Sequence, residues 1–196
     1  MFRKSLALIA VLLLSQLIFA QQKNEPSDVT SVAQAESVFI IKTVFLVRHA
    51  ERADEPRQDP PLTEKGVARS EALARLLSTA DIKTIYTSQF ARTMLTAEPL
   101  AKKLGVTATA ISLKTSPSNP RAIAEESTKE VVDKIMSQID GSVLVVGHSN
   151  SIPDVIKMLG GNVVPTIDEK KFDDLFIVTV FAKGQAKVTH LKYGSE

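Results

Sequence analysis

The spacing of apolar residues along this chain predicts strands in some segments and helices in others. Four short, uniformly apolar or β-branched runs are typical of buried strands; they cover residues 38–47, 82–87, 106–111 and 142–147. Three segments repeat apolar positions at helical spacing; they cover residues 64–78, 89–104 and 119–138. Two alternating runs, 175–182 and 187–193, are separated by KGQA and predict an antiparallel hairpin.

Local signals set the expected helix ends. Thr63 predicts the start of the first helix, and Gly105 predicts the end of the second. Residues 119–120, an asparagine followed by a proline, predict the start of the long third helix. Ser151 and Asp154 resemble a capping box that opens a fourth helix. Strands alternating with helices predict an α/β fold, a three-layer α/β/α sandwich with a mostly parallel sheet and the hairpin at one edge.

The first 20 residues have the composition of a secretory signal peptide. Arg3 and Lys4 precede an apolar stretch that ends at Ala20, a small residue suited to cleavage. Residues 21–37 are polar and aperiodic and predict a tether, which leaves residues 38–196 as the single domain. An uncleaved membrane anchor is the alternative, but the apolar core is shorter than the roughly 20 residues that span a bilayer. We therefore expect an exported, periplasmic or secreted, protein without stable membrane insertion after cleavage.

Charge and cysteine content exclude several classes of function. The chain has 24 basic and 22 acidic residues, but two of the basic ones lie in the export segment. The remaining chain is therefore neutral. The basic pI of the full sequence comes from the export segment and is no sign of nucleic-acid binding. The absence of cysteine rules out disulfides, thiolate metal ligands and a cysteine nucleophile.

Candidate chemistry gathers where strands end. Arg48 and His49 follow the first strand, and His148 follows the strand at 142–147. Arg92 lies in the first turn after another strand. Ligands of open α/β sheets bind outside the carboxyl ends of the strands, so these four side chains are expected to converge in one crevice. Two arginines and two histidines without a cluster of metal ligands predict a site for a dianion such as phosphate.

These residue types suit phosphoryl transfer. A neutral imidazole can attack phosphorus to form a phosphohistidine, which water then hydrolyses. Arg48 and Arg92 would hold the non-bridging oxygens, and a protonated His148 would hold a third. Each residue also has a structural interpretation, because strand-end histidines often bind loop carbonyls and Arg92 could lie on a helix surface. His190, inside an alternating run, is expected to be an ordinary strand residue.

Four sequence blocks in order resemble the histidine phosphatase superfamily, also called phosphoglycerate mutase-like. They are RHAE, LTEKG, TSQFARTMLTAE and GHSN, and the resemblance covers about residues 43–159. The resemblance implies the family's α/β/α sandwich, with His49 as the phosphorylated nucleophile and Arg48, Arg92 and His148 completing the phosphate pocket. It also implies that Asn150, in GHSNS, contacts the phosphate.

Departures from the family pattern concern the substrate and the general acid. Mutases carry RHGxSxxN and a later glutamate in a tryptophan-containing block, whereas this chain has RHAERADE and no tryptophan, which argues against a mutase. The general acid that protonates the leaving oxygen is left unassigned. The candidates are Glu51, Asp54, Glu55, Glu125 and Glu126, and solvated surface carboxylates are an equal interpretation for each.

The chain has no lid insertion, and in this it is similar to the small phosphatase branch that includes phosphohistidine protein phosphatases. Export argues against that substrate, because phosphorelay proteins work inside the cell. The sequence therefore predicts an exported, cofactor-free and metal-independent phosphatase that acts on small phosphate esters or on a phosphorylated envelope sugar. Two alternatives are a non-catalytic phosphate- or phosphosugar-binding domain and, with an uncleaved anchor, an envelope interaction module.

Overall fold

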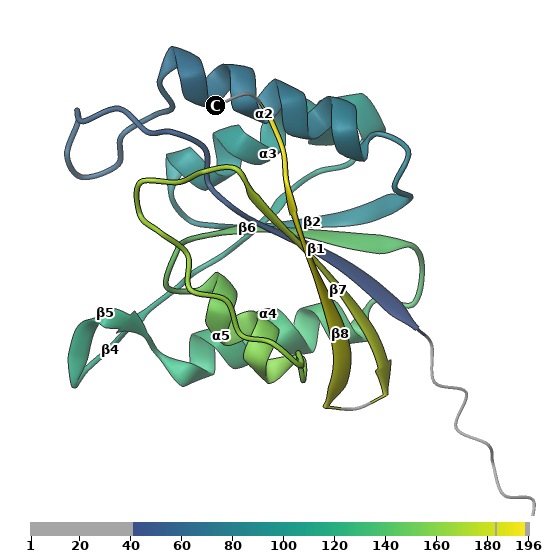
Figure 1. Cartoon of the computed structure of the whole chain (residues 1–196). Helices are drawn as coiled ribbons and strands as arrows, with labels where there is room; N and C mark the ends of the chain where they lie inside the picture. Colours follow the sequence, from purple (N-terminus) through teal and green to yellow (C-terminus); the bar gives the residue numbers. More distant parts are fainter. Residues whose placement is uncertain (1–40, 183, 195–196) are drawn as a thin grey trace, which may run out of the picture. The chain divides into compact units, whose positions relative to one another are not determined.

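A six-stranded sheet forms the centre of this computed structural model, which describes residues 41–182 and 184–194 (Figure 1). Its strands lie side by side in the order β3 (Thr109–Ile111), β2 (Ile82–Ser88), β6 (Ser142–Gly147), β1 (Lys42–Arg48), β7 (Asp174–Ala182), β8 (Gln185–Lys192). The first four are parallel to one another, whereas β7 runs antiparallel to both β1 and β8. The predicted mostly parallel sheet with a hairpin at one edge is confirmed.

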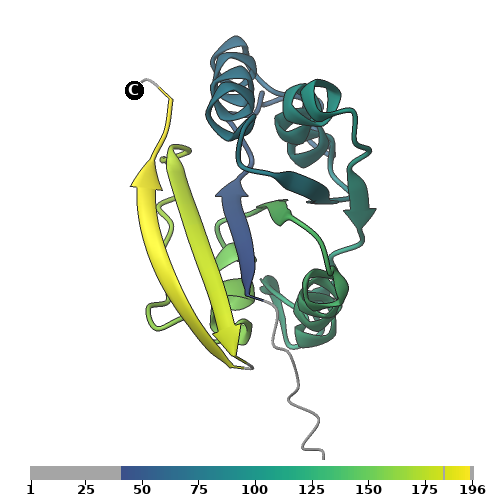
Figure 2. The same cartoon turned by 90° about the vertical axis from the view of Figure 1, so that its right-hand side faces the viewer.

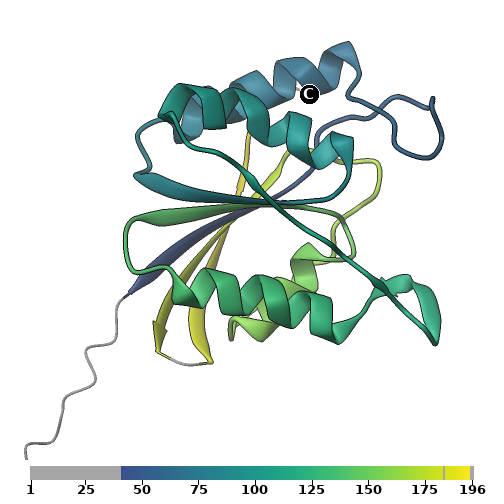
Figure 3. The ribbon, with the colours of Figure 1, turned by 180° about the vertical axis from the view of Figure 1, so that it is seen from behind.

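Two pairs of helices cover the two faces of the sheet. Helices α2 (Glu64–Leu77) and α3 (Ala91–Leu104) lie on one face, and α4 (Glu125–Ser137) and α5 (Ile152–Met158) lie on the other (Figures 2 and 3). The chain thus forms the three-layer sandwich that the alternation of strands and helices predicted.

The sheet is stable because its central strands are buried on both faces. Val44 and Leu46 of β1 belong to the core beneath α4 and α5, whereas Phe45 and Val47 belong to the core beneath α2 and α3. Strand β6 alternates in the same way. Burying each such side chain contributes about 1.5–3 kcal/mol, which explains the uniformly apolar strand sequences.

The predicted start of α2 and the predicted end of α3 are correct. The Thr63 hydroxyl accepts a hydrogen bond from the backbone N–H of Gly66 (3.1 Å), and Gly105 ends α3 with a φ of 67°. Gly66 also permits a close approach of α2 to the loop after β1. A Cβ at this position would lie 2.1 Å from the carbonyl oxygen of Glu51, so any larger residue would displace that loop.

The predicted start of the third helix is wrong. Residues Thr115–Ser116 (β4) and Asn119–Ile123 (β5) form a small antiparallel ribbon, and α4 begins only at Glu125. The residue before a proline is restricted to extended backbone, which favours a strand over a helix at position 119. The Asn119 side chain accepts from the N–H of Arg121 (3.1 Å), a local turn bond rather than a helix cap.

The capping box expected at the start of α5 does not form. Ser151 precedes α5, but its side chain makes no capping bond to the helix. Its hydroxyl instead accepts a hydrogen bond from the N–H of His148 (2.9 Å). The side chain therefore stabilises the turn after β6, which carries one of the candidate site residues.

The expected signal peptide and tether, residues 1–37, lie outside the described residues. Within residues 41–182 and 184–194, no helix is long and apolar enough to cross a bilayer.

Candidate active site

The pairing of β1 with β6 brings the two predicted site histidines together. Arg48 is paired with Gly147, and the N–H of His49 donates to the Gly147 carbonyl (2.9 Å). His148 is the next residue, so the two imidazoles leave neighbouring strands at the same level. Their ring centroids lie 5.4 Å apart.

His49 is held in the form that a nucleophile needs. Its Nδ1 lies 2.8 Å from the carbonyl oxygen of Ala50, and a carbonyl can only accept, so Nδ1 carries the proton. The lone pair of Nε2 is then free to attack. Burial, helped by the charges of Arg48 and Arg92, lowers the pKa of His49 to about 4, so the imidazole is neutral at pH 7.

His148 is held from behind by a chain of hydroxyl groups. Its Nε2 lies 2.9 Å from the Ser88 hydroxyl, which lies 2.9 Å from the Thr93 hydroxyl, and Thr93 donates to the Phe90 carbonyl (2.8 Å). Burial and the charge of Arg92 lower the pKa of His148 to about 3. A protonated His148 therefore requires a bound anion that raises this pKa again.

The two predicted arginines lie beside these histidines and have unused hydrogen-bonding capacity. Among the described residues, four buried side-chain polar atoms have no hydrogen-bond partner, and two of them are the Nε atoms of Arg48 and Arg92. Burial lowers the pKa of both guanidinium groups, although both remain charged at neutral pH. Buried donors without partners are costly, so their presence here favours an anion as the ligand.

Two phenylalanines that the sequence did not indicate flank the site. Phe172 lies 4.3 Å from the Arg48 guanidinium carbon, measured to the ring centroid, and its centroid is 5.9 Å from that of His49. Phe90 makes the corresponding contacts with Arg92 (4.2 Å) and His148 (5.6 Å). Phe90 is two residues before Arg92 and could have been suspected, but Phe172 comes from the loop before β7, which has no periodic signal.

Backbone groups of that same loop bind Arg48. Its Nη1 donates to the carbonyls of Asp168 (3.1 Å) and Lys171 (3.2 Å), and the charge of Glu169 acts on the same guanidinium. Through these two hydrogen bonds, Arg48 holds the loop that carries Phe172 in place.

Asp59, also missed in the sequence, attaches the loop at residues 51–62 to α3. Both of its carboxylate oxygens accept from the N–H of Ala91 (2.9 and 3.1 Å), the first residue of the helix. One oxygen lies 3.9 Å from Nη1 of Arg92. Arg52 of the same loop adds a positive charge that helps to lower the pKa of His49.

Asn150 lies on the turn after His148, but its side chain is engaged elsewhere. Its amide nitrogen donates to the carbonyl of Arg121 (2.9 Å), and the residue is exposed. Its contact with phosphate stays a prediction.

Glu51, the acid candidate nearest to the nucleophile, forms a buried ion pair instead. Arg69, whose side chain is 4% exposed, donates to both carboxylate oxygens through Nε and to one through Nη2 (2.8–3.1 Å). Burial opposes ionisation of Glu51, but these hydrogen bonds outweigh it and lower its pKa. A carboxylate held in this way is a poor proton donor.

The other acid candidates make no described contact with either site histidine. Glu55 pairs with Arg57 at the surface, and Asp54 is exposed. Glu125 lines a groove between α4 and α5 with Asp154 and Lys157.

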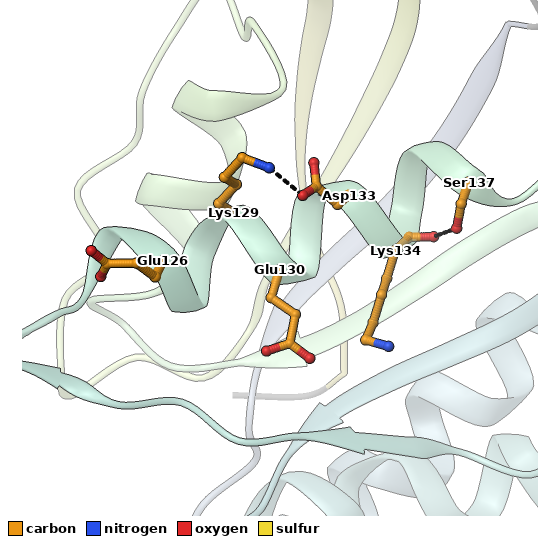
Figure 4. A pocket seen from close by; sticks show the side chains of 6 residues that line it. All are labelled: Glu126, Lys129, Glu130, Asp133, Lys134 and Ser137. Atoms are coloured by element: carbon orange, nitrogen blue, oxygen red, sulfur yellow. Dashed lines mark hydrogen bonds and ion pairs between the residues drawn. The ribbon is translucent and has the colours of Figure 1, made fainter.

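Glu126 lines a hollow of about 430 Å³ along α4 (Figure 4). Every residue that lines it belongs to this one helix; they are Glu126, Lys129, Glu130, Asp133, Lys134 and Ser137. Lys129 and Asp133, one turn apart on α4, form an ion pair. The hollow contains no strand-end residue and is therefore separate from the candidate site.

Comparisons with known proteins agree with the fold. The chain is similar to the protein histidine phosphatase SixA complexed with tungstate (19% identity, 76% of this chain and 96% of that chain, TM-score 0.61). It is also similar to a phosphoglycerate mutase from Bacillus anthracis (19%, 77% and 92%, 0.59) and to a putative alpha-ribazole-5'-P phosphatase from Escherichia coli (14%, 79% and 99%, 0.60). No curated protein gives a significant match.

The fold is thus of the phosphoglycerate mutase-like class, with the candidate site at the carboxyl ends of its parallel strands. The sequence profile of the histidine phosphatase superfamily (branch 1) matches residues 44–114, which include Arg48, His49 and Arg92. Over these residues the chain matches the histidine phosphatase superfamily, and the similar solved structures share its fold.

Replacing Glu51 with glutamine should destabilise the protein rather than remove a general acid. The substitution removes the carboxylate charge that the buried Arg69 binds through three hydrogen bonds, and we expect the free energy of unfolding to fall by about 3 kcal/mol in urea titrations. Glu55→Gln is the matched control, because its ion pair is exposed, and it should leave stability unchanged. An unchanged stability of Glu51→Gln, with loss of one limb of the pH–rate profile, would instead assign the acid to Glu51.

Stability should fall as the pH is lowered from about 6.5 towards 4. The unfolded histidines bind protons near pH 6.5, whereas the folded pKa values of His49 and His148 are about 4 and about 3. Below pH 6.5 the unfolded state therefore binds more protons than the folded state, and the free energy of unfolding falls by up to about 1.4 kcal/mol per pH unit for each histidine. Above pH 6.5 this stabilisation is fully present, because the histidines are neutral in both states. Urea unfolding at several pH values should show a steeper decline for the wild type than for the double variant His49→Gln/His148→Gln. Equal slopes would contradict the burial of neutral histidines.

Proposed function

We propose that this protein is an exported, metal-independent phosphatase that hydrolyses small phosphate monoesters through a phosphohistidine on His49. The proposal rests on the tautomer, the pKa and the surroundings of His49. Its Nδ1–H is bound to a backbone carbonyl, its pKa is low, and its Nε2 lone pair is free near two arginines whose Nε atoms are buried without a hydrogen-bond partner.

The reaction divides into two displacements at phosphorus. In the first, Nε2 of His49 forms a bond to phosphorus as the bond from phosphorus to the leaving oxygen breaks. In the second, water attacks the phosphohistidine, the P–N bond breaks, and its electron pair returns to Nε2 while inorganic phosphate leaves. The arginines stabilise charge on the non-bridging oxygens in both steps.

The bound phosphate also changes the state of His148. A dianion between Arg48, Arg92 and the two imidazoles favours the protonated form of His148, which then donates to a third phosphoryl oxygen. The Ser88 hydroxyl behind its Nε2 holds the ring for this role. The two guanidinium groups and the protonated His148 supply the positive charge that a metal ion supplies in other phosphatases.

Similar structures support a small substrate. Among them are a mycobacterial glucosyl-3-phosphoglycerate phosphatase (12% identity, TM-score 0.59) and the putative alpha-ribazole-5'-P phosphatase. Both names describe phosphate esters of sugar-containing molecules, in keeping with a small ester or a phosphorylated envelope sugar as the substrate here. The similarity to SixA supports a phosphohistidine protein as the alternative substrate.

Substitution of His49 should abolish turnover. With an activated aryl phosphate and a chelator present, His49→Ala should lower kcat by at least about 1,000-fold, because the nucleophile is lost. His190→Ala is the matched control, since His190 lies on β8 bound to Asp174, outside the site. Samples of the wild type denatured during turnover should carry acid-labile phosphate on the protein, and His49→Ala should carry none.

Two results would contradict the proposal. Turnover by His49→Ala at the level of His190→Ala would exclude the phosphohistidine mechanism, and loss of wild-type turnover on chelation would exclude metal independence. A wild type that binds inorganic phosphate but hydrolyses no ester would favour the non-catalytic binding domain.

Export is supported by the basic-then-apolar order of residues 1–20. When the full chain is produced in a bacterial host, we expect the exported fraction to begin at or near Gln21, as measured by N-terminal sequencing. An N-terminus at Met1 in the membrane fraction would support the anchor, and a cytoplasmic full-length chain would contradict export.

A further inference from the structure

One buried hydroxyl group connects the two segments that carry the nucleophile and the second arginine. Thr96 lies on α3 and is fully buried. Its Oγ1 accepts from the backbone N–H of Ala50 (2.9 Å), and its hydroxyl donates to the carbonyl of Arg92 (2.7 Å). Both directions are certain, because an N–H only donates and a carbonyl only accepts.

The contact reaches the nucleophile through a single residue. Ala50, which is also fully buried, receives the Nδ1–H of His49 on its carbonyl oxygen and gives its own N–H to Thr96. The orientation of the imidazole thus depends on the position of Ala50. The other end of the bridge lies on the backbone of Arg92, whose guanidinium is part of the same site.

We propose that Thr96 is a positioning residue, whose hydroxyl sets the distance between the His49 loop and the first turn of α3 that carries Arg92. This inference rests on the proposed phosphatase function, since the distance matters when one phosphoryl group must contact both segments. Asp59 holds the same turn through Ala91, but from the outer loop, and it makes no described contact with the His49 backbone.

Thr96→Val removes this bridge with little change in volume. It leaves the buried Ala50 N–H without an acceptor, so the His49 loop is free to shift relative to Arg92. A displacement of about 1 Å of a reacting group can cost about 100-fold in rate. We therefore expect kcat on an aryl phosphate to fall by about 10- to 100-fold with KM changed by less than about 3-fold.

The chain offers a matched control and a rescue. Thr87 is also buried, but its hydroxyl has no hydrogen-bond partner, so Thr87→Val removes a buried hydroxyl without removing a contact. This control should retain wild-type kcat and KM. Thr96→Ser keeps the hydroxyl and should restore kcat to within about 3-fold of the wild type, which a packing role of the methyl group would not predict.

Calorimetric titration with orthovanadate separates this inference from the proposed function. Vanadate adopts the five-coordinate geometry of phosphoryl transfer, so its affinity should fall in Thr96→Val in proportion to kcat/KM and be retained in Thr87→Val and Thr96→Ser. A wild type without turnover would overturn the phosphatase proposal, yet the vanadate affinities would still test Thr96.

The positioning role is overturned if Thr96→Val matches Thr87→Val in both kcat and vanadate affinity, or if Thr96→Ser is as impaired as Thr96→Val. If Thr96→Val does not fold, Thr96→Cys replaces it, because a thiol keeps the volume and is a weak donor and acceptor. We then expect an intermediate fall in kcat and in vanadate affinity, and wild-type values would overturn the inference.

Discussion

The hydrogen bond from the His49 N–H to the Gly147 carbonyl is the constraint on which the site depends. It extends the parallel pairing of β1 and β6 by one residue beyond the strands. Because of it, His49 and His148 emerge side by side even though they are far apart in the sequence. A change of register by one residue would turn one imidazole to the opposite face of the sheet.

This arrangement concentrates positive charge where water is scarce. Arg48 and Arg92 lie close to the two histidines, and burial together with their positive charges keeps both imidazoles neutral. The guanidinium groups keep their charge and are only partly satisfied by backbone carbonyls and phenylalanine rings. A bound phosphate would supply acceptors for the buried Nε atoms of the two arginines.

Two loops around this centre are attached to the sheet and helices by polar contacts. Glu51 fixes the loop after β1 to Arg69, which also donates to the carbonyl of Tyr193 near the C-terminus. Asp59 fixes the next part of that loop to α3, and Arg48 holds the loop before β7. Glu51, which resembles a catalytic acid in the sequence, thus serves to hold the loop that follows the candidate nucleophile in place.

Local sequence patterns predicted a mostly parallel sheet, helices on both of its faces, the start of α2 and the end of α3, because burial on two faces and helix capping leave a signal in short segments. The sequence also indicated which strand ends carry Arg48, His49 and His148. The role of Glu51 depends on its contact with Arg69 in the fold, since a carboxylate beside a nucleophile looks the same in sequence whether it donates a proton or binds an arginine. The same holds for Phe172 and Thr96, whose partners lie in distant segments, and no periodicity records contacts of that kind.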